Sequence, residues 1–126
     1  MARITGIGGI FLRAQDRAAL SAWYRDVLGL PMQDWHGAMF MAGGPPEEAP
    51  PYSLFTLFAH DTPYFGPGGK ACMVNFVVDD LDGLLSRLRA AGAGVDEKVE
   101  DSEYGRFGWV TDPEGNRIEL WQPARG

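Results

Sequence analysis

The sequence has 126 residues, of which 45% are hydrophobic and 22% charged, so it can fold as a single domain, residues 1–126, with its own core. Its formal net charge of −6 argues against a nucleic-acid partner, because phosphate binding needs a basic surface. The single cysteine, Cys72, permits no intramolecular disulfide, and no stretch approaches the roughly 20 apolar residues of a membrane span. We therefore expect a soluble, cytoplasmic domain with no membrane partner.

The first half of the chain begins with a strand and a helix. Residues 7–15 alternate as a strand does, with Ile10, Leu12 and Ala14 on the face expected to pack against helices. Asp16 is suited to cap a helix that ends at Gly29. The apolar residues of that helix recur at helical spacing and are Leu20, Trp23, Tyr24, Val27 and Leu28, with core packing or a dimer contact expected for Trp23. Further strands are expected near residues 33–35, 38–41 and 52–59, the first two joined by a turn at His36-Gly37.

The second half repeats this pattern. Residues 72–78 alternate as a strand, Asp80 is suited to cap a helix, and Gly92 ends it. Ile10 and Val74, like Asp16 and Asp80, are 64 residues apart, so strand face and helix cap recur at one offset. Strands are then expected near residues 95–99, 106–111 and 116–122. The pattern predicts an α+β fold made of two βαβββ modules.

Two stretches rich in glycine and proline interrupt the pattern. Residues 65–69, FGPGG, are typical of a linker. Module one is therefore expected over about residues 4–62, the linker over about 63–70 and module two over about 71–123. Residues 43–51 form a second loop. A plain connector is the simpler interpretation of both stretches, and a mobile flap over a ligand is the alternative.

Three motifs resemble one protein superfamily. Residues 104–120, YGRFGWVTDPEGNRIEL, are similar to the C-terminal motif of the vicinal oxygen chelate superfamily, which contains glyoxalase I, extradiol dioxygenases and bleomycin resistance proteins. Residues 23–30, WYRDVLGL, resemble its first helix, and residues 78–82, VDDLD, resemble the start of its second. The resemblance implies a half-open barrel around a central cavity and, as in many bacterial members, a homodimer. It is weak for the reaction, since the superfamily performs several chemistries on one scaffold.

The resemblance also implies where a divalent metal would be bound, through one side chain from each of four strands. Those positions fall on Gly9, on the segment from Thr56 to Phe58, on Met73 and on Glu119. Only Glu119 offers a strong ligand, and a single carboxylate does not hold such an ion. We therefore expect no metal cofactor. The alternative is a relocated site in which His36, His60 and Glu119 converge.

The alternation of the strands predicts which other side chains face the cavity. The helix-facing residues leave Phe11 and Arg13, Met73 and Asn75, and Arg117, Glu119 and Trp121 on the opposite face. Arg13, Asn75, Arg117 and Glu119 are expected to form a polar floor that orients a ligand, although an ion pair between Glu119 and an arginine is the simpler interpretation. Trp35, Trp109 and Trp121 are candidates for aromatic walls around a flat ligand, with core packing as the alternative.

The sequence assigns no catalytic residue. Glu119 is the one candidate for a general base inside the cavity, whereas His36 and His60 lie near turns and are expected in solvent. Tyr64 lies beside the linker and is a further candidate to cap a pocket, and Cys72 is expected to be a buried, inert thiol.

We expect a glyoxalase-like protein that binds a small, partly aromatic or amphipathic molecule in its barrel, by sequestration as the bleomycin resistance branch implies. The alternatives are a metal-dependent lyase, isomerase or dioxygenase, a metal-free enzyme that uses Glu119 or a histidine as a base, and a dimerisation module whose cavity is filled core.

Overall fold

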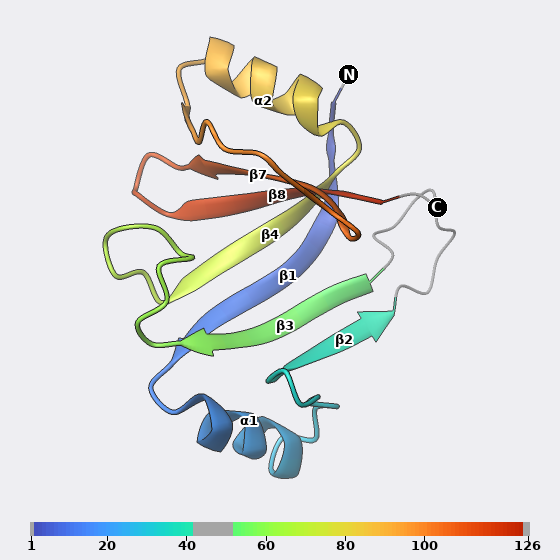
Figure 1. The fold of residues 1–126 in the computed structure, drawn as a ribbon, viewed down its shortest axis with the longest axis vertical. Helices are drawn as coiled ribbons and strands as arrows, with labels where there is room; N and C mark the ends of the chain where they lie inside the picture. The colour runs from blue at the N-terminus through green and yellow to red at the C-terminus, as the bar shows by residue number, and fades with distance from the viewer. Residues whose placement is uncertain (1, 42–51, 125–126) are drawn as a thin grey trace.

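The computed structural model describes residues 2–41 and 52–124. The first half contains β1 (Ile4–Ala14), α1 (Arg17–Asp26), β2 (Gly37–Met41) and β3 (Tyr52–Ala59). The second half contains β4 (Cys72–Val78), α2 (Leu81–Ala90), β5 (Gly94–Val95), β6 (Glu100–Ser102), β7 (Gly105–Thr111) and β8 (Arg117–Pro123). The strands form one mixed, open sheet that curves between the two helices, which lie at opposite ends of the molecule (Figure 1). The predicted α+β half-open barrel is confirmed.

The two halves of the sheet are related by the sequence repeat. The strand order is β2-β3-β1-β4-β8-β7-β5, with β1 parallel to β3 and β4 parallel to β8. The halves join through β1 and β4, which run antiparallel and pair Ile10 with Val74. These two residues are equivalent in the repeat, so an approximate two-fold axis passes between them and places the cavity where the halves meet.

The two helices begin at the predicted caps. The carboxylate of Asp16 accepts a hydrogen bond from the Ala19 amide at 3.0 Å, and that of Asp80 accepts one from the Gly83 amide at 3.1 Å. Each helix has 10 residues. Within the described part of the chain, neither helix is long and apolar enough to cross a membrane.

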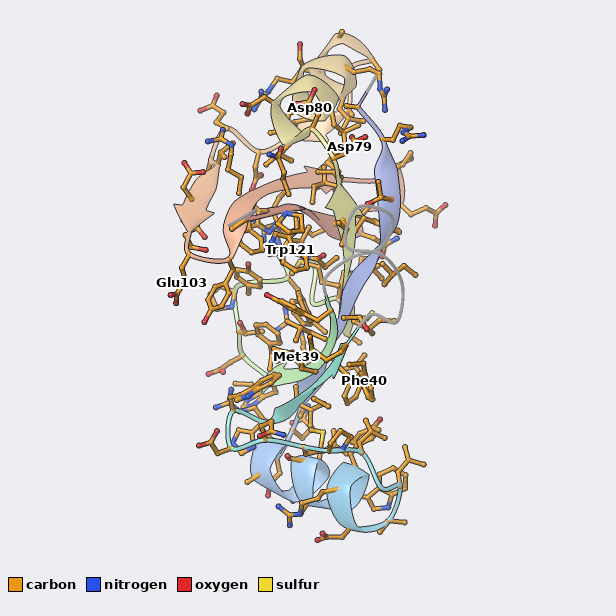
Figure 2. All side chains as sticks on the ribbon, turned by 90° about the vertical axis from the view of Figure 1, so that its right-hand side faces the viewer. Met39, Phe40, Asp79, Asp80, Glu103 and Trp121 are labelled. Carbon is orange, nitrogen blue, oxygen red and sulfur yellow. The ribbon has the colours of Figure 1, made fainter. Side chains whose placement is uncertain are left out.

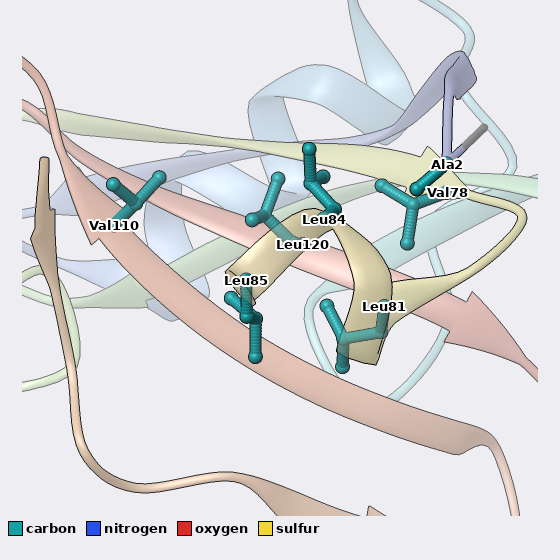
Figure 3. Close-up of a cluster of buried hydrophobic side chains, with 7 residues drawn as sticks. All are labelled: Ala2, Val78, Leu81, Leu84, Leu85, Val110 and Leu120. Atoms are coloured by element: carbon teal, nitrogen blue, oxygen red, sulfur yellow. The ribbon is translucent and has the colours of Figure 1, made fainter. Parts of the chain in front are cut away.

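Helix α2 packs on its half of the sheet in the predicted manner. Leu81, Leu84 and Leu85 are buried against Val78 of β4 and Leu120 of β8, with Ala2 and Val110 completing the cluster (Figure 3). Gly108 of β7 leaves room for this packing, because a Cβ atom there would lie 3.2 Å from a methyl group of Leu85. Helix α2 therefore supplies the outer core of the second half.

Helix α1 buries fewer apolar side chains than α2 does. Trp23, Val27 and Leu28 are exposed by 47%, 68% and 55%, and Ser21 is the buried residue of the helix. Its main aromatic contact joins Tyr24 to Phe55 of β3, with ring centroids 4.9 Å apart. The apolar stripe of residues 20–28 is therefore only partly covered, and Val27 and Leu28 lie just beyond the end of α1 at Asp26.

Two predicted strands differ in the structure. Residues 33–35 form a turn rather than a strand, closed by a hydrogen bond of 2.8 Å from the Gln33 amide to the Gly37 carbonyl. His36 occupies the left-handed region of this turn, with φ of 62°. The predicted strand at 95–99 divides into the short strands β5 and β6, both paired with β7.

The linker between the halves packs into the molecule. Phe65 is 1% exposed and lies in a second core cluster with Phe11, Met73 and Trp109. Arg13 of β1 donates hydrogen bonds to the carbonyl oxygens of three surrounding loop residues, His60, Thr62 and Lys70. This segment is a packed connector. The predicted loop at residues 43–51 lies outside the described residues.

Candidate ligand-binding cavity

A cavity of about 330 Å³ lies on the concave side of the sheet. Its walls are aromatic and come from both halves of the chain, namely from Phe11, Trp35, Tyr52, Tyr104, Phe107 and Trp121. Met39 and Leu54 add aliphatic surface, and Gly8, Asn75 and Glu119 form the floor. Met39 and Trp121 are found in the central part of the molecule, between the two helices (Figure 2).

Trp121 is the central residue of the aromatic wall. Its ring stacks on Phe107, with centroids 6.1 Å apart and an interplanar angle of 6°, and it contacts Tyr52 at 5.2 Å. Its indole N–H donates a hydrogen bond of 2.8 Å to the Tyr104 carbonyl. The indole is thereby held in one orientation, and offset aromatic stacking of this kind favours a flat ligand.

Glu119 is buried at the floor of the cavity, with 2% exposure. One carboxylate oxygen accepts a hydrogen bond of 2.7 Å from the Asn75 amide nitrogen. The other accepts a hydrogen bond of 3.0 Å from the Trp109 indole N–H and one from the Tyr64 hydroxyl. Three neutral donors from three parts of the chain therefore offset the cost of burying this carboxyl group.

Burial decides the protonation chemistry of this cluster. The loss of water raises the pKa of Glu119 above its usual range, and the hydrogen bonds from Tyr64, Asn75 and Trp109 oppose that rise only in part. Burial also raises the pKa of the Tyr64 phenol, and the neighbouring Glu119 carboxyl adds to the effect. Tyr64 therefore remains a hydrogen-bond donor.

Gly8 makes the floor accessible. A shift in register between β1 and β4 near Ile7 and Gly9 brings Gly8 to the cavity. A Cβ atom at Gly8 would lie 2.2 Å from the Asn75 side-chain oxygen and 2.9 Å from the Trp121 ring. Both distances are shorter than any real contact, so glycine is required here for the amide and the indole to occupy these positions.

The two arginines predicted on the floor lie elsewhere. Arg13 faces inward but at the end of β1, where its guanidinium group stacks 5.0 Å from the centroid of Phe65. Arg117 forms an ion pair of 2.8 Å with Asp96 and lies 4.9 Å from the Trp109 ring centroid. The expected ion pair with Glu119 was wrong, because each arginine is engaged by carbonyl or carboxylate oxygens outside the cavity.

The nine residues predicted to contact a ligand therefore divide into two groups. Five line the cavity, namely Phe11, Trp35, Asn75, Glu119 and Trp121. Met73 and Trp109 are buried behind it, at 1% and 2% exposure, in the cluster that contains Phe65. Arg13 and Arg117 are likewise predicted contact residues that do not line the cavity. Alternation indicates the inward face of a strand, but not which inward residues reach the empty part of the barrel.

The residues at the superfamily's metal positions do not fit a divalent ion. Gly9 has no side chain, and a Cβ atom there would lie 2.9 Å from the Phe11 ring. Met73 is buried among aromatic rings, and Glu119 already accepts three hydrogen bonds. Of His36, His60 and Glu119, only Glu119 lines the cavity. Among residues 2–41 and 52–124, no three His, Cys, Asp or Glu side chains are grouped so as to hold a metal.

Several lining residues were not predicted from the sequence. Met39, Tyr52, Leu54, Tyr104 and Phe107 join the cavity. Tyr52 and Leu54 share one face of β3, which the pairing of Phe11 with Thr56 brings beside β1. Phe107 pairs with Trp121 across β7 and β8. Cys72 is exposed, contrary to the prediction of a buried thiol.

Residues 9–121 match the glyoxalase-like domain family. Uncharacterized proteins of Mycobacterium tuberculosis and Mycobacterium bovis are each 39% identical to the chain over 59 residues, which are 46% of this chain. Those residues cover 35% of the M. tuberculosis protein and 39% of the M. bovis protein. The match therefore spans well under half the length of these curated relatives.

Solved structures agree with the fold. A Streptomyces coelicolor methylmalonyl-CoA epimerase in complex with 2-nitronate-propionyl-CoA has a TM-score of 0.70 at 19% identity, over 98% of this chain and 100% of that one. The Mycobacterium tuberculosis methylmalonyl-CoA epimerase has a TM-score of 0.66 at 22% identity, over 97% and 90%. A glyoxalase/bleomycin resistance protein/dioxygenase superfamily member from Vibrio splendidus has a TM-score of 0.59 at 18% identity, over 97% and 99%. At such identities the likeness concerns the fold alone.

Proposed function

The chain belongs to the glyoxalase-like domain family, and on that premise we propose that it binds a small, flat and largely apolar molecule in its cavity. The observation that carries this proposal is the combination of aromatic walls with a polar floor made by Asn75 and Glu119. Ligand cavities commonly pair apolar walls with a few fixed polar groups, and a volume of about 330 Å³ suits a small ligand.

We also propose that binding is independent of a divalent metal ion. Support comes from the donor set, because Glu119 is the one strong metal ligand among the described residues that line the cavity. Its oxygens are already engaged by Tyr64, Asn75 and Trp109. Coordination of a metal would break these hydrogen bonds and leave buried donors without partners, which is costly.

Sequestration is the mode of action that this cavity favours. Among its described lining residues there is no cysteine, lysine or histidine to act as a nucleophile or base. Glu119 accepts hydrogen bonds within the protein, and its role is to orient Asn75 and Trp109. Binding without turnover requires no more than this arrangement.

Calorimetric titration with 2-naphthol, a flat bicyclic aromatic compound, tests the proposal. We expect saturable one-to-one binding that is unchanged by a chelator. Met39→Trp fills the cavity from its exposed rim and should weaken binding about tenfold or more. Phe40→Trp is the matched control, since the neighbouring residue is equally exposed but does not line the cavity.

Two results would contradict the proposal. If 2-naphthol does not bind the wild-type protein, the proposed ligand site is wrong. If binding is lost when a chelator is added, the proposed independence of metal is wrong. Elemental analysis of protein purified without chelator checks the second point directly, because a stoichiometric transition metal would point to a relocated metal site.

We further propose that two copies associate through the convex side of the sheet. Ile4, Ile7 and Ile10 of β1 are exposed there by 52%, 52% and 40%. The exposed Trp23 of α1 and Val27, which follows the helix, add to the apolar surface of the same half of the chain. A homodimer suits such a face, because a two-fold interface brings the same apolar patch of both copies together.

A further inference from the structure

The side-chain amide of Asn75 is held in one orientation by Glu119. Its nitrogen donates the hydrogen bond of 2.7 Å to the Glu119 carboxyl, and Asn75 is 3% exposed. A carboxylate oxygen accepts and cannot donate in return, so the amide nitrogen must face Glu119. The amide oxygen therefore points away from Glu119 and lies against Gly8, where a Cβ atom would be only 2.2 Å from it.

That oxygen is an unused hydrogen-bond acceptor. Among the described residues, no donor lies within hydrogen-bonding distance of the Asn75 Oδ1 atom, although it is buried. Both Gly8 and Asn75 line the cavity. Leaving a buried acceptor without a partner is unfavourable, and a ligand that supplies a donor recovers that free energy.

The rest of the cavity restricts the charge of the ligand. No lysine or arginine is found among its described lining residues. An anionic group at the floor would face the oxygen atoms of both Asn75 and Glu119 with no cation to offset their repulsion. The stacked rings of Phe107 and Trp121 supply a flat surface beside this floor.

We propose that the Asn75 side-chain oxygen selects uncharged aromatic ligands that carry an N–H or O–H group, by accepting a hydrogen bond from that group. This inference rests on the proposed function, since it requires that the cavity binds a ligand at all. Glu119 is a positioning residue in this scheme, because it sets the orientation of the amide and leaves its oxygen free.

Replacing one carboxyl oxygen of Glu119 by an NH₂ group should reverse the orientation of the Asn75 amide. In Glu119→Gln, the glutamine oxygen must face the Trp109 indole N–H, which can only donate. The glutamine NH₂ group then faces Asn75, whose amide must turn so that its oxygen accepts. Asn75 then presents NH₂ to the cavity, and the selection for ligand donors is lost while the packing is kept.

Three probes with the same ring system test the selection by calorimetry. 2-Naphthol carries an O–H donor, 2-methoxynaphthalene carries an ether oxygen in its place, and 2-naphthoate is an anion. We expect 2-naphthol to bind the wild-type protein about tenfold more tightly than the ether, equivalent to about 1.4 kcal/mol. The ether is the more apolar compound, so burial alone would favour it instead. 2-Naphthoate should bind more weakly than either.

The variant separates selection by Asn75 from the shape of the cavity. In Glu119→Gln the preference for 2-naphthol over the ether should fall to about twofold or less. Glu97→Gln removes one exposed carboxylate outside the cavity and should keep the wild-type preference. A tenfold preference that persists in Glu119→Gln overturns the inference, because the amide then does not set the selection.

The wild-type titrations decide the matter even if the variant does not fold. Equal binding of both neutral probes, weakened alike by Met39→Trp, overturns the inference and leaves the proposed function intact. Tighter binding of 2-naphthoate also overturns the inference. If no probe binds, the proposed function fails and the inference fails with it.

Discussion

Glu119 shows how a single buried residue organises the floor of the cavity. Its carboxyl group joins Asn75 of β4, Trp109 of β7 and Tyr64 of the linker, which are far apart in the sequence. None of the described arginines forms an ion pair with it, so three neutral donors and the more distant positive charge of Arg117 oppose the cost of its burial. Desolvation remains the largest influence and raises its pKa. This group is therefore the site at which pH should act on the stability of the fold.

Replacing Glu119 by glutamine tests that pKa. A carboxyl whose folded pKa lies above the ordinary 4.5 contributes stability that is fully present below about pH 4.5 and lost as the pH rises through the folded value. From about pH 4.5 to pH 8, the wild type should lose stability relative to Glu119→Gln, by about 1.4 kcal/mol for each unit of pKa difference. Urea unfolding of both proteins across this range measures the change.

Comparison with the variant isolates Glu119 from other carboxylates. The pKa values of Asp79 and Asp112 are lowered by hydrogen bonds, so these groups destabilise the fold at acid pH, but they do so equally in both proteins. A constant difference in unfolding free energy across the range would show that the three donors cancel the effect of burial.

Arg13 of β1 holds the segment that connects the two halves of the chain. Arg13 donates 2.5 Å, 2.9 Å and 2.7 Å hydrogen bonds to the carbonyl oxygens of Lys70, His60 and Thr62. Its guanidinium also covers Phe65, the residue that inserts into the core. The arginine therefore fixes the path of the linker and closes one end of the barrel next to Tyr64.

Arg13→Met should release this segment. The variant keeps much of the side-chain bulk but loses all three charge-assisted hydrogen bonds, so we expect the free energy of unfolding to fall by roughly 2–4 kcal/mol. Hydrogen exchange should accelerate across residues 60–71 while α2 is unaffected. Arg17→Met, at an exposed position in α1, is the matched control. Unchanged exchange in residues 60–71 would mean that Phe65 packing alone holds the linker.

The whole molecule is an imperfect duplication. The repeat brings Ile10 and Val74 together at the centre of the sheet, and both modules begin a helix at an aspartate cap. The helices then differ, because α2 buries three leucines whereas α1 leaves Trp23 exposed, as is Val27 at its C-terminal end. The exposed apolar surface consequently lies on the first half and on the convex side of β1, which supports an interface with a second copy.

Ile7→Lys tests the dimer. A lysine in the middle of this face would bury charge between two copies, so we expect the mass measured by light scattering to change from that of a dimer to that of a monomer. Ala90→Lys, at the exposed end of α2, should leave the dimer intact. A wild-type protein that is monomeric at all concentrations would contradict the proposed association.

The fold followed from local and repeated patterns in the sequence. Strand alternation, the caps Asp16 and Asp80, and the 64-residue offset are set by neighbours along the chain, so they could be predicted without a structure. The same logic placed Glu119 and Trp121 on an inward face, and superposition of the superfamily's metal positions on Gly9 and Met73 indicated an incomplete ligand set.

Tertiary structure alone decided what surrounds those residues. The register shift in β1 brings Gly8 to the cavity, and the path of the linker brings Tyr64 to Glu119 while drawing Arg13 away. Alternation specifies the side of a strand, but the sheet curves, so residues on one side reach the cavity, the core or a loop according to their depth. Contacts between distant strands are set by that curvature, and no local pattern encodes it.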